Sequence, residues 1–125
     1  ITPAAGFVAP VPALVIGILT AVVCYFSVTK LKILLKYDDS MDAFGIHGIG
    51  GMVGAVLTGM FVSTTISGAS VNWFAQIEGI GLTVLYSGLV SLVLLKIIDK
   101  TMGLRVDADE ERQGLDINSH GERIE

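Results

Sequence analysis

The sequence predicts an all-α integral membrane protein with three transmembrane helices. Its 125 residues are 52% hydrophobic and 16% charged, with a mean hydropathy of +0.72, whereas a soluble domain carries about 25% charged residues. No Asp, Glu, Lys or Arg lies between Ile1 and Thr29, or between Ala43 and Ile77. Both stretches exceed the ~18 residues that mark a candidate membrane span. A soluble helical bundle is therefore disfavoured.

The first span is expected over residues 12–35. Pro12 suits a first helical turn, because its missing N–H would be unpaired there anyway. An apolar series follows, closed by Lys30, Lys32 and Lys36. The segment lacks the basic start and short apolar core of a cleaved signal peptide. Because the chain opens without a methionine, we expect it to be part of a longer polypeptide.

The second span is expected over residues 43–63 and the third over residues 77–102. Asp42 is a natural N-cap for the second span, since acids favour the positive end of a helix dipole. A stretch rich in Ser, Thr and Gly, residues 63–72, predicts a short exposed loop between the two spans. Trp73 then fits an aromatic position at the membrane interface.

The basic residues predict the orientation of the spans. They cluster after the first span and at the end of the third, whereas the loop between the second and third holds no Lys or Arg. By the positive-inside rule, the N-terminus of the chain is expected outside and the tail in the cytoplasm. We therefore expect a membrane region over residues 1–106 and an acidic cytoplasmic tail over residues 107–125.

The tail determines the net charge of −4, because seven of the 12 acidic residues lie in it. Such a composition is typical of a solvated, partly disordered segment. Its glycines and apolar residues nevertheless have the spacing of turns, at Gly114, Leu115, Ile117 and Gly121. The tail is therefore not simple low-complexity sequence.

No pattern in the chain predicts an enzyme, a cofactor or a metal site. The two histidines lie in different regions and Cys24 lies alone in an apolar run, so no metal-ligand cluster is expected. The Gly-rich run of the second span lacks the strand and the Lys-Ser/Thr of a phosphate-binding loop. No Ser–His–carboxylate set is evident, and the basic residues are too few and too interfacial for nucleic acid.

His47 is the ionisable residue inside the second span. Such residues are rare within spans and generally face a cavity or a partner. A neutral imidazole offers one donor and one acceptor, which suits proton handling or solvation of a small amine, and equally suits a structural hydrogen bond to a neighbouring helix. The residues leave both interpretations open. At helical spacing, His47 would share one face with Gly51, Gly54 and Thr58.

The small residues of the second span favour helix packing as their main role. Pairs such as Gly50/Gly54 and Ala55/Gly59 let membrane helices approach closely. The acids before the span admit two roles, a cap for the helix start or a brace that shapes the field at a cation pathway. The three acids concerned are Asp38, Asp39 and Asp42.

The run from Asp38 to Gly51, DDSMDAFGIHGIGG, closely resembles the DD-x-x-D-x-F-x-x-H-G-x-x-G pattern of the ammonium transporter (Amt/Mep/Rh) family. The opening residues 1–8 resemble the start of the family's ninth span. Residues 103–106 and 110–122 resemble its cytoplasmic C-terminal segment. The resemblance covers essentially the whole chain, with three motifs in the same order.

The resemblance implies that the chain is the C-terminal part of an eleven-helix bundle, which assembles as a homotrimer with one pore per subunit in the plasma membrane. Ammonium would be recruited outside and deprotonated, and ammonia would pass a hydrophobic lumen. His47 would be the second of two paired pore histidines. Structural or pore-supporting roles are expected for five residues: Asp39, Asp42, Gly48, Gly51 and Gly54.

The tail is implied to pack beneath the neighbouring subunit and to help present the pore to a PII-type regulatory protein. The matching tail residues are Gly114, Asp116, His120, Gly121 and Glu122. The alternatives are a Rh-type gas channel, an ammonium sensor, or a truncated regulatory or assembly subunit that docks into full-length trimers. The first pore histidine belongs to spans outside this chain, so the chain is not expected to transport alone.

Overall fold

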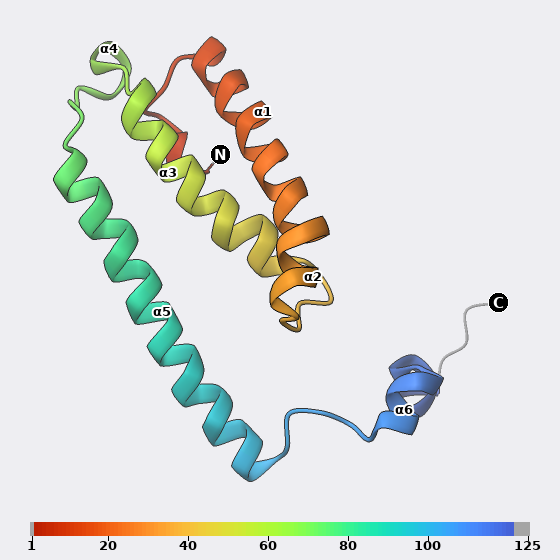
Figure 1. Cartoon of the computed structure of the whole chain (residues 1–125). Helices are drawn as coiled ribbons and strands as arrows, with labels where there is room; N and C mark the ends of the chain where they lie inside the picture. The colour runs from red at the N-terminus through yellow and green to blue at the C-terminus, as the bar shows by residue number, and fades with distance from the viewer. Residues whose placement is uncertain (1, 122–125) are drawn as a thin grey trace. The chain divides into compact units, whose positions relative to one another are not determined.

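The structure is a computed structural model that describes residues 2–121, and in this part of the chain it contains helices and no strand (Figure 1). The η symbol marks a 3₁₀ helix in η1 and π-helices in η2, η3 and η4. The elements are η1 (Thr2–Ala4), α1 (Pro10–Phe26), η2 (Ser27–Leu31), α2 (Lys32–Leu35), η3 (Phe44–Ile49), α3 (Gly50–Phe61), α4 (Thr64–Ser67), α5 (Trp73–Thr101), α6 (Ala108–Gln113) and η4 (Asp116–His120).

Three helical stretches are long and apolar enough to cross a membrane: Pro10–Leu35, Phe44–Phe61 and Trp73–Thr101. The predicted fold class, all-α with three transmembrane helices, is confirmed. The first stretch starts at Pro10, so that two prolines occupy its first turn, where neither lacks a needed N–H. The third starts at Trp73 rather than residue 77, because the Asn72 side chain accepts the N–H of Ala75 at 3.1 Å and caps the helix.

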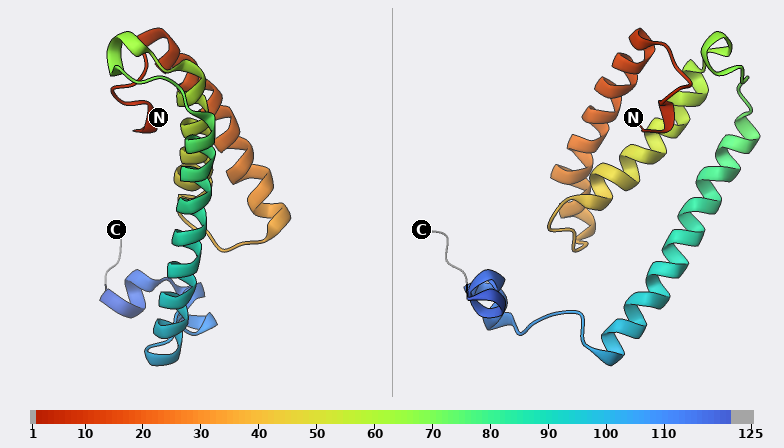
Figure 2. Two further views of the ribbon diagram at one scale, coloured as in Figure 1. Left: turned by 90° about the vertical axis from the view of Figure 1, so that its left-hand side faces the viewer. Right: turned by 180° about the vertical axis from the view of Figure 1, so that it is seen from behind.

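The chain divides into two units, Ile1–Thr83 and Val84–Glu125. In the first unit, α1 and α3 lie side by side and are joined by the turn that follows α2 (Figures 1 and 2). Ile16 and Thr20 are buried on α1, and Gly50, Gly54 and Thr58 are buried on α3, where Gly50 lies against Cys24 and Thr20 of α1. Small residues on α3 allow this close approach, as the sequence predicts.

Two π-helical segments face each other where the first two spans meet. η2 interrupts the first span near its end, η3 begins the second span, and the two segments pack together. A π-helix bonds each N–H to the carbonyl five residues back, so it carries more residues per turn than an α-helix. The sequence predicts ordinary α-helix at both places. The difference changes the angular spacing of the side chains within residues 27–31 and 44–49.

The far end of α3 is tied to the N-terminal segment and to the start of α5. The Ser63 N–H donates to the Phe7 carbonyl at 2.8 Å. The Gln76 amide donates to the Ala55 carbonyl, and a Cβ on Gly59 would lie 3.1 Å from the Trp73 ring. Trp73, expected at the membrane interface, therefore also packs on α3.

The loop predicted over residues 63–72 contains one short helix, α4. The Ser63 carbonyl accepts the Ser67 N–H at 3.0 Å and the Ser67 hydroxyl at 2.8 Å. These two bonds close a helical turn that composition alone does not reveal, because serine is common both in loops and at helix ends. Gly68 then ends the turn with φ at +67°, a conformation that favours glycine.

In the second unit, nearly every side chain is exposed. Among the residues from 84 to 121 whose exposure the structure describes, all but Gly114 are exposed. Where the sequence predicts a partly disordered tail with turns, the structure has α6 and η4. Gly114, at φ +97°, and Gly121, at φ +67°, lie at the ends of these segments. Asn118 joins the two by donating to the carbonyls of Glu110 and Gly114 at 3.1 and 3.3 Å.

Candidate functional site

The carboxylate of Asp39 caps the helix that carries His47. Its Oδ1 accepts the N–H of Ala43 at 2.8 Å, and its Oδ2 accepts those of Phe44 at 2.9 Å and Gly45 at 3.3 Å. The first turn of a helix leaves such N–H groups without an acceptor. A capping side chain contributes about 1 kcal/mol, and a carboxylate also meets the positive end of the helix dipole. Asp39 therefore holds the first turn of η3.

Lys32 of α2 holds the turn between the two spans. Its Nζ donates to Oδ1 of Asp42 at 2.7 Å and to the backbone carbonyl of Asp39. The Lys32 side chain is 27% exposed and that of Asp42 is 36% exposed, so the ion pair is partly shielded from solvent. One lysine from the first span thus contacts both ends of the Asp39–Asp42 turn.

Asp42 was the expected cap, and the structure corrects this prediction. Its carboxylate pairs with Lys32, while Asp39 supplies the oxygens that cap the helix. The physical reason is the backbone of Asp42, whose φ of +55° differs from the extended conformation of a capping residue. That left-handed conformation costs an L-residue about 1–2 kcal/mol, although Asp adopts it more readily than most.

Two glycines bring the second span against the first at this point. A Cβ on Gly45 would lie 2.7 Å from Cγ1 of Val28 and 3.3 Å from Oγ of Ser27. A Cβ on Gly50 would lie 2.9 Å from Sγ of Cys24. The predicted packing role is confirmed at Gly50, and the contact at Gly45 is as close.

Gly48 lies close to a side chain of its own helix rather than to the first span. A Cβ there would lie 2.9 Å from the ring of Phe44, one turn earlier in the same helix. The Phe44 ring also meets Tyr37 edge to face, with centroids 5.6 Å apart and planes at 85°. Gly48 therefore leaves room for an aromatic pair that covers the turn between the spans.

His47 lies in η3 with its side chain exposed. Within residues 2–121, its imidazole has no hydrogen-bond or ion-pair partner. Of the two roles that the sequence leaves open, a structural hydrogen bond is therefore not made to any described part of this chain. Short π-helical segments inside helices frequently occur at functional sites, and η3 is such a segment.

His47, Gly51, Gly54 and Thr58, which helical spacing puts on one face, differ in their surroundings. Gly54 and Thr58 are buried, His47 is exposed, and the Cβ position of Gly51 meets no atom within 4 Å. Gly51, Gly54 and Thr58 keep α-helical spacing within α3, and the π-helical segment η3 changes the angular spacing only on the side of His47. Gly54 has a packing position, whereas Gly51 faces open space.

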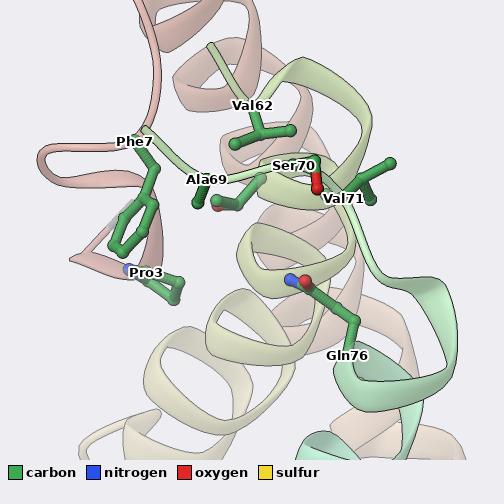
Figure 3. Close-up of a pocket in the computed structure, with 9 residues that line it drawn as sticks. Pro3, Phe7, Val62, Ala69, Ser70, Val71 and Gln76 are labelled. Atoms are coloured by element: carbon green, nitrogen blue, oxygen red, sulfur yellow. The ribbon is translucent and has the colours of Figure 1, made fainter. Parts of the chain in front are cut away.

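An open pocket of about 190 Å³ lies at the other end of α3, as Figure 3 shows. It is lined by Pro3, Phe7, Thr58, Gly59, Val62, Ala69, Ser70, Val71 and Gln76. None of these side chains is ionisable, so the pocket has no charged group for a cation.

The tail residues singled out by the sequence lie in the second unit. Asp116 occupies the first turn of η4 and His120 its last turn, which suits the helix dipole at both ends. Gly114 and Gly121 serve the turns described above. Glu122 lies outside the described residues.

Lys32 and Gly45 are parts of this site that the sequence does not predict. In the sequence Lys32 resembles Lys30 and Lys36, and only the structure shows that it contacts Asp42, ten residues away across the turn. Gly45 stands between the two recognised residues Phe44 and His47. A close contact with another helix cannot be read from that position alone.

Within residues 2–121, no three His, Cys, Asp or Glu side chains are placed to hold a metal ion. The site is instead one imidazole on an apolar helix, whose first turn is held by Asp39, Asp42 and Lys32. Ionisable groups inside a span characterise proteins that move ions or polar solutes across membranes. Fold and site together describe a multi-pass helical membrane protein with one ionisable side chain inside its second span.

The sequence model of the Ammonium Transporter Family matches residues 1–124, and the chain belongs to this family. It is 41% identical over 133 residues to an ammonium transporter of Bacillus subtilis and 42% identical over 130 residues to one of Aquifex aeolicus. An ammonium transporter of Archaeoglobus fulgidus is 40% identical over 129 residues.

Each of these alignments covers 98% of this chain but only 33%, 30% and 33% of the respective relative. The chain therefore spans about a third of the length of the curated relatives that it matches. Among solved structures, none matches it. The family consists of transporters and channels rather than enzymes.

Proposed function

We propose that the chain forms the last three spans of an ammonium transporter, and that the whole protein carries ammonium or ammonia across the plasma membrane. The observation that carries the proposal is His47, an exposed imidazole in an otherwise uncharged apolar span. Membership of the family, over nearly the whole chain, supports the same function.

His47 is proposed as the second of two pore histidines, the first lying in a part of the protein outside this chain. A neutral imidazole can accept a hydrogen bond at one nitrogen and donate at the other. In an apolar lumen, desolvation disfavours a charged substrate, so ammonium must leave its proton to a carrier before ammonia passes. Two neighbouring imidazoles provide such a carrier, because each can take up a proton as the other releases one.

The orientation proposed for the spans places the tail in the cytoplasm. The basic residues on that side, Lys30, Lys36, Lys96 and Lys100, support it through the positive-inside rule. We further propose a homotrimer in which the tail packs beneath the neighbouring subunit and contributes to the surface for a PII-type regulator. The exposed polar surface of α6 and η4 is available for such contacts.

Uptake of labelled methylammonium by cells tests the proposal. The full-length polypeptide that carries this sequence is compared with its His47→Ala variant at matched membrane expression. Met41→Ala is the control, because Met41 is 85% exposed in the turn before the helix. We expect His47→Ala to lose uptake or to change ion selectivity, and Met41→Ala to do neither. Unchanged uptake and unchanged selectivity in His47→Ala would assign His47 to structural hydrogen bonding.

A further inference from the structure

The direction of the His47 side chain depends on how the second span begins. Successive residues of an α-helix are about 100° apart around the axis, since one turn holds 3.6 residues. A change of one residue in the register of η3 would therefore turn the imidazole to another side of the helix. Whatever fixes the start of η3 also fixes where His47 points.

Two sets of contacts fix the start of η3, those of the Asp39 carboxylate and those of the Lys32 ammonium. Asp39 holds the N–H groups of Ala43, Phe44 and Gly45 through its carboxylate. Lys32 holds the same Asp39 through its backbone carbonyl, and it holds Asp42 through a 2.7 Å ion pair. The lysine thus connects the first span to the residue that caps the second.

Close packing leaves the turn little freedom to adjust by itself. The position of a Cβ on Gly45 is only 2.7 Å from Val28 in η2, so sliding of η3 along η2 would bring other side chains into this contact. Asp42 also keeps its left-handed backbone, at φ +55°, while its carboxylate is held by Lys32. Loss of the lysine would release the turn at the point where its conformation is least favourable.

We propose that Lys32 is a positioning residue for His47: through Asp39 and Asp42 it sets the register of η3 and hence the orientation of the pore imidazole. The inference rests on the proposed transport function, because it assigns Lys32 a part in the conduction step. Its effect on transport passes through His47, and Lys32 itself does not contact the substrate.

Lys32→Gln in the full-length polypeptide tests this role, with Lys36→Gln as the matched control. Both changes remove one positive charge from the same end of the first span, so they alter the positive-inside signal equally. Lys36 is exposed, and no contact of its ammonium with Asp39 or Asp42 is found in the described part of the chain. Lys32→Arg, which keeps the charge and the donors, is the conservative variant.

The maximal rate of methylammonium uptake and its half-saturating concentration are measured at equal surface amounts of protein. We expect Lys32→Gln to lower the maximal rate on the order of tenfold, as a small misplacement of a reacting group does, with Lys32→Arg restoring most of it. Lys36→Gln should stay within about twofold of the unmodified protein, as most surface changes do.

A second background separates positioning from mere stability. If Lys32 acts through His47, Lys32→Gln should cause little further loss of the uptake that a His47→Ala protein retains, because the group that it positions is absent. Where His47→Ala retains no uptake, equal Tm values for Lys32→Gln and the unmodified protein make the same separation, and a lowered Tm contradicts positioning. A full tenfold loss in both backgrounds would overturn the inference. So would normal uptake by Lys32→Gln while His47→Ala is defective, and that result leaves the proposed function intact.

If His47→Ala itself transports normally with unchanged selectivity, the proposed function fails first, and the role of Lys32 fails with it. If Lys32→Gln does not reach the membrane, Asp42→Asn replaces it, since that change weakens the ion pair and retains the bond from Lys32 to the Asp39 carbonyl. Asp42→Asn should then show a smaller loss that also disappears in the His47→Ala background. A loss of equal size in both backgrounds contradicts the proposal.

Discussion

The paired helices α1 and α3 and the residues from 84 onward in α5 are similarly apolar, but only the pair has an interior. Ile16, Thr20, Gly54 and Thr58 are buried where α1 meets α3, whereas the described residues of α5 include no buried side chain. A helix that is apolar on all sides belongs in a membrane or a large core. Composition therefore suits both regions to a membrane, and the buried residues show that α1 and α3 pack on each other.

The largest effect is expected at the narrowest contact between the first two spans. Gly45→Ala places a methyl group 2.7 Å from the stiff side chain of Val28, and such overpacking costs about 1–3 kcal/mol. Gly51→Ala is the matched control, because its Cβ meets no atom within 4 Å and alanine favours a helix. Thermal unfolding of the detergent-purified full-length protein measures both. Equal Tm values would mean that the contact is not tight.

The helix cap should have the next largest effect. Asp39→Ala removes the acceptor of three N–H groups and should destabilise the protein by about 0.5–2 kcal/mol. Ser40→Ala changes an exposed neighbour in the same turn and should leave Tm unchanged. Thermal unfolding again supplies the comparison. If Asp42→Ala lowered Tm and Asp39→Ala did not, the capping role would return to Asp42.

A buried hydroxyl in the paired helices should respond in the opposite direction, because its removal should not destabilise the protein. The Thr20 hydroxyl is buried without a hydrogen-bond partner among the described residues, so Thr20→Val should be neutral or stabilise by about 1 kcal/mol. Thr83 of α5 is exposed and donates to the Gly79 carbonyl at 2.7 Å, and Thr83→Val is the control. Destabilisation by Thr20→Val alone would reveal a partner for this hydroxyl elsewhere in the full-length protein.

The smallest effect is expected in the tail. Arg105 and Glu111 form an ion pair of 2.7 Å with side chains that are 61% and 51% exposed. Exposed pairs contribute about 0.2–1 kcal/mol and weaken in salt. Glu111→Gln should therefore lower stability slightly in dilute buffer and have no effect in concentrated salt. A large effect that is independent of salt would show that Glu111 has a buried partner in the assembled protein.

Much of the site could be predicted from residues 38–51, because the family pattern lies in one continuous stretch. The pattern identified His47 and placed Asp39 and Asp42 at the start of its helix. The position next to the helix predicted Asp42 as the cap, and only the hydrogen bonds of Asp39 and the backbone φ of Asp42 show otherwise. The contact of Lys32 with Asp42 could not be predicted from this stretch, because Lys32 lies outside it, on the other side of the turn between the spans.

The sequence by itself determined that this protein is a helical membrane protein of the ammonium transporter family. Long uncharged runs and a contiguous motif are local properties, and they need no knowledge of what packs against what. The tertiary structure alone decided which acid caps the second span, that Lys32 joins the two helices, and that π-helical segments stand where the first two spans meet. Those features depend on backbone angles and on contacts between distant residues, which form only when the first two spans fold against each other.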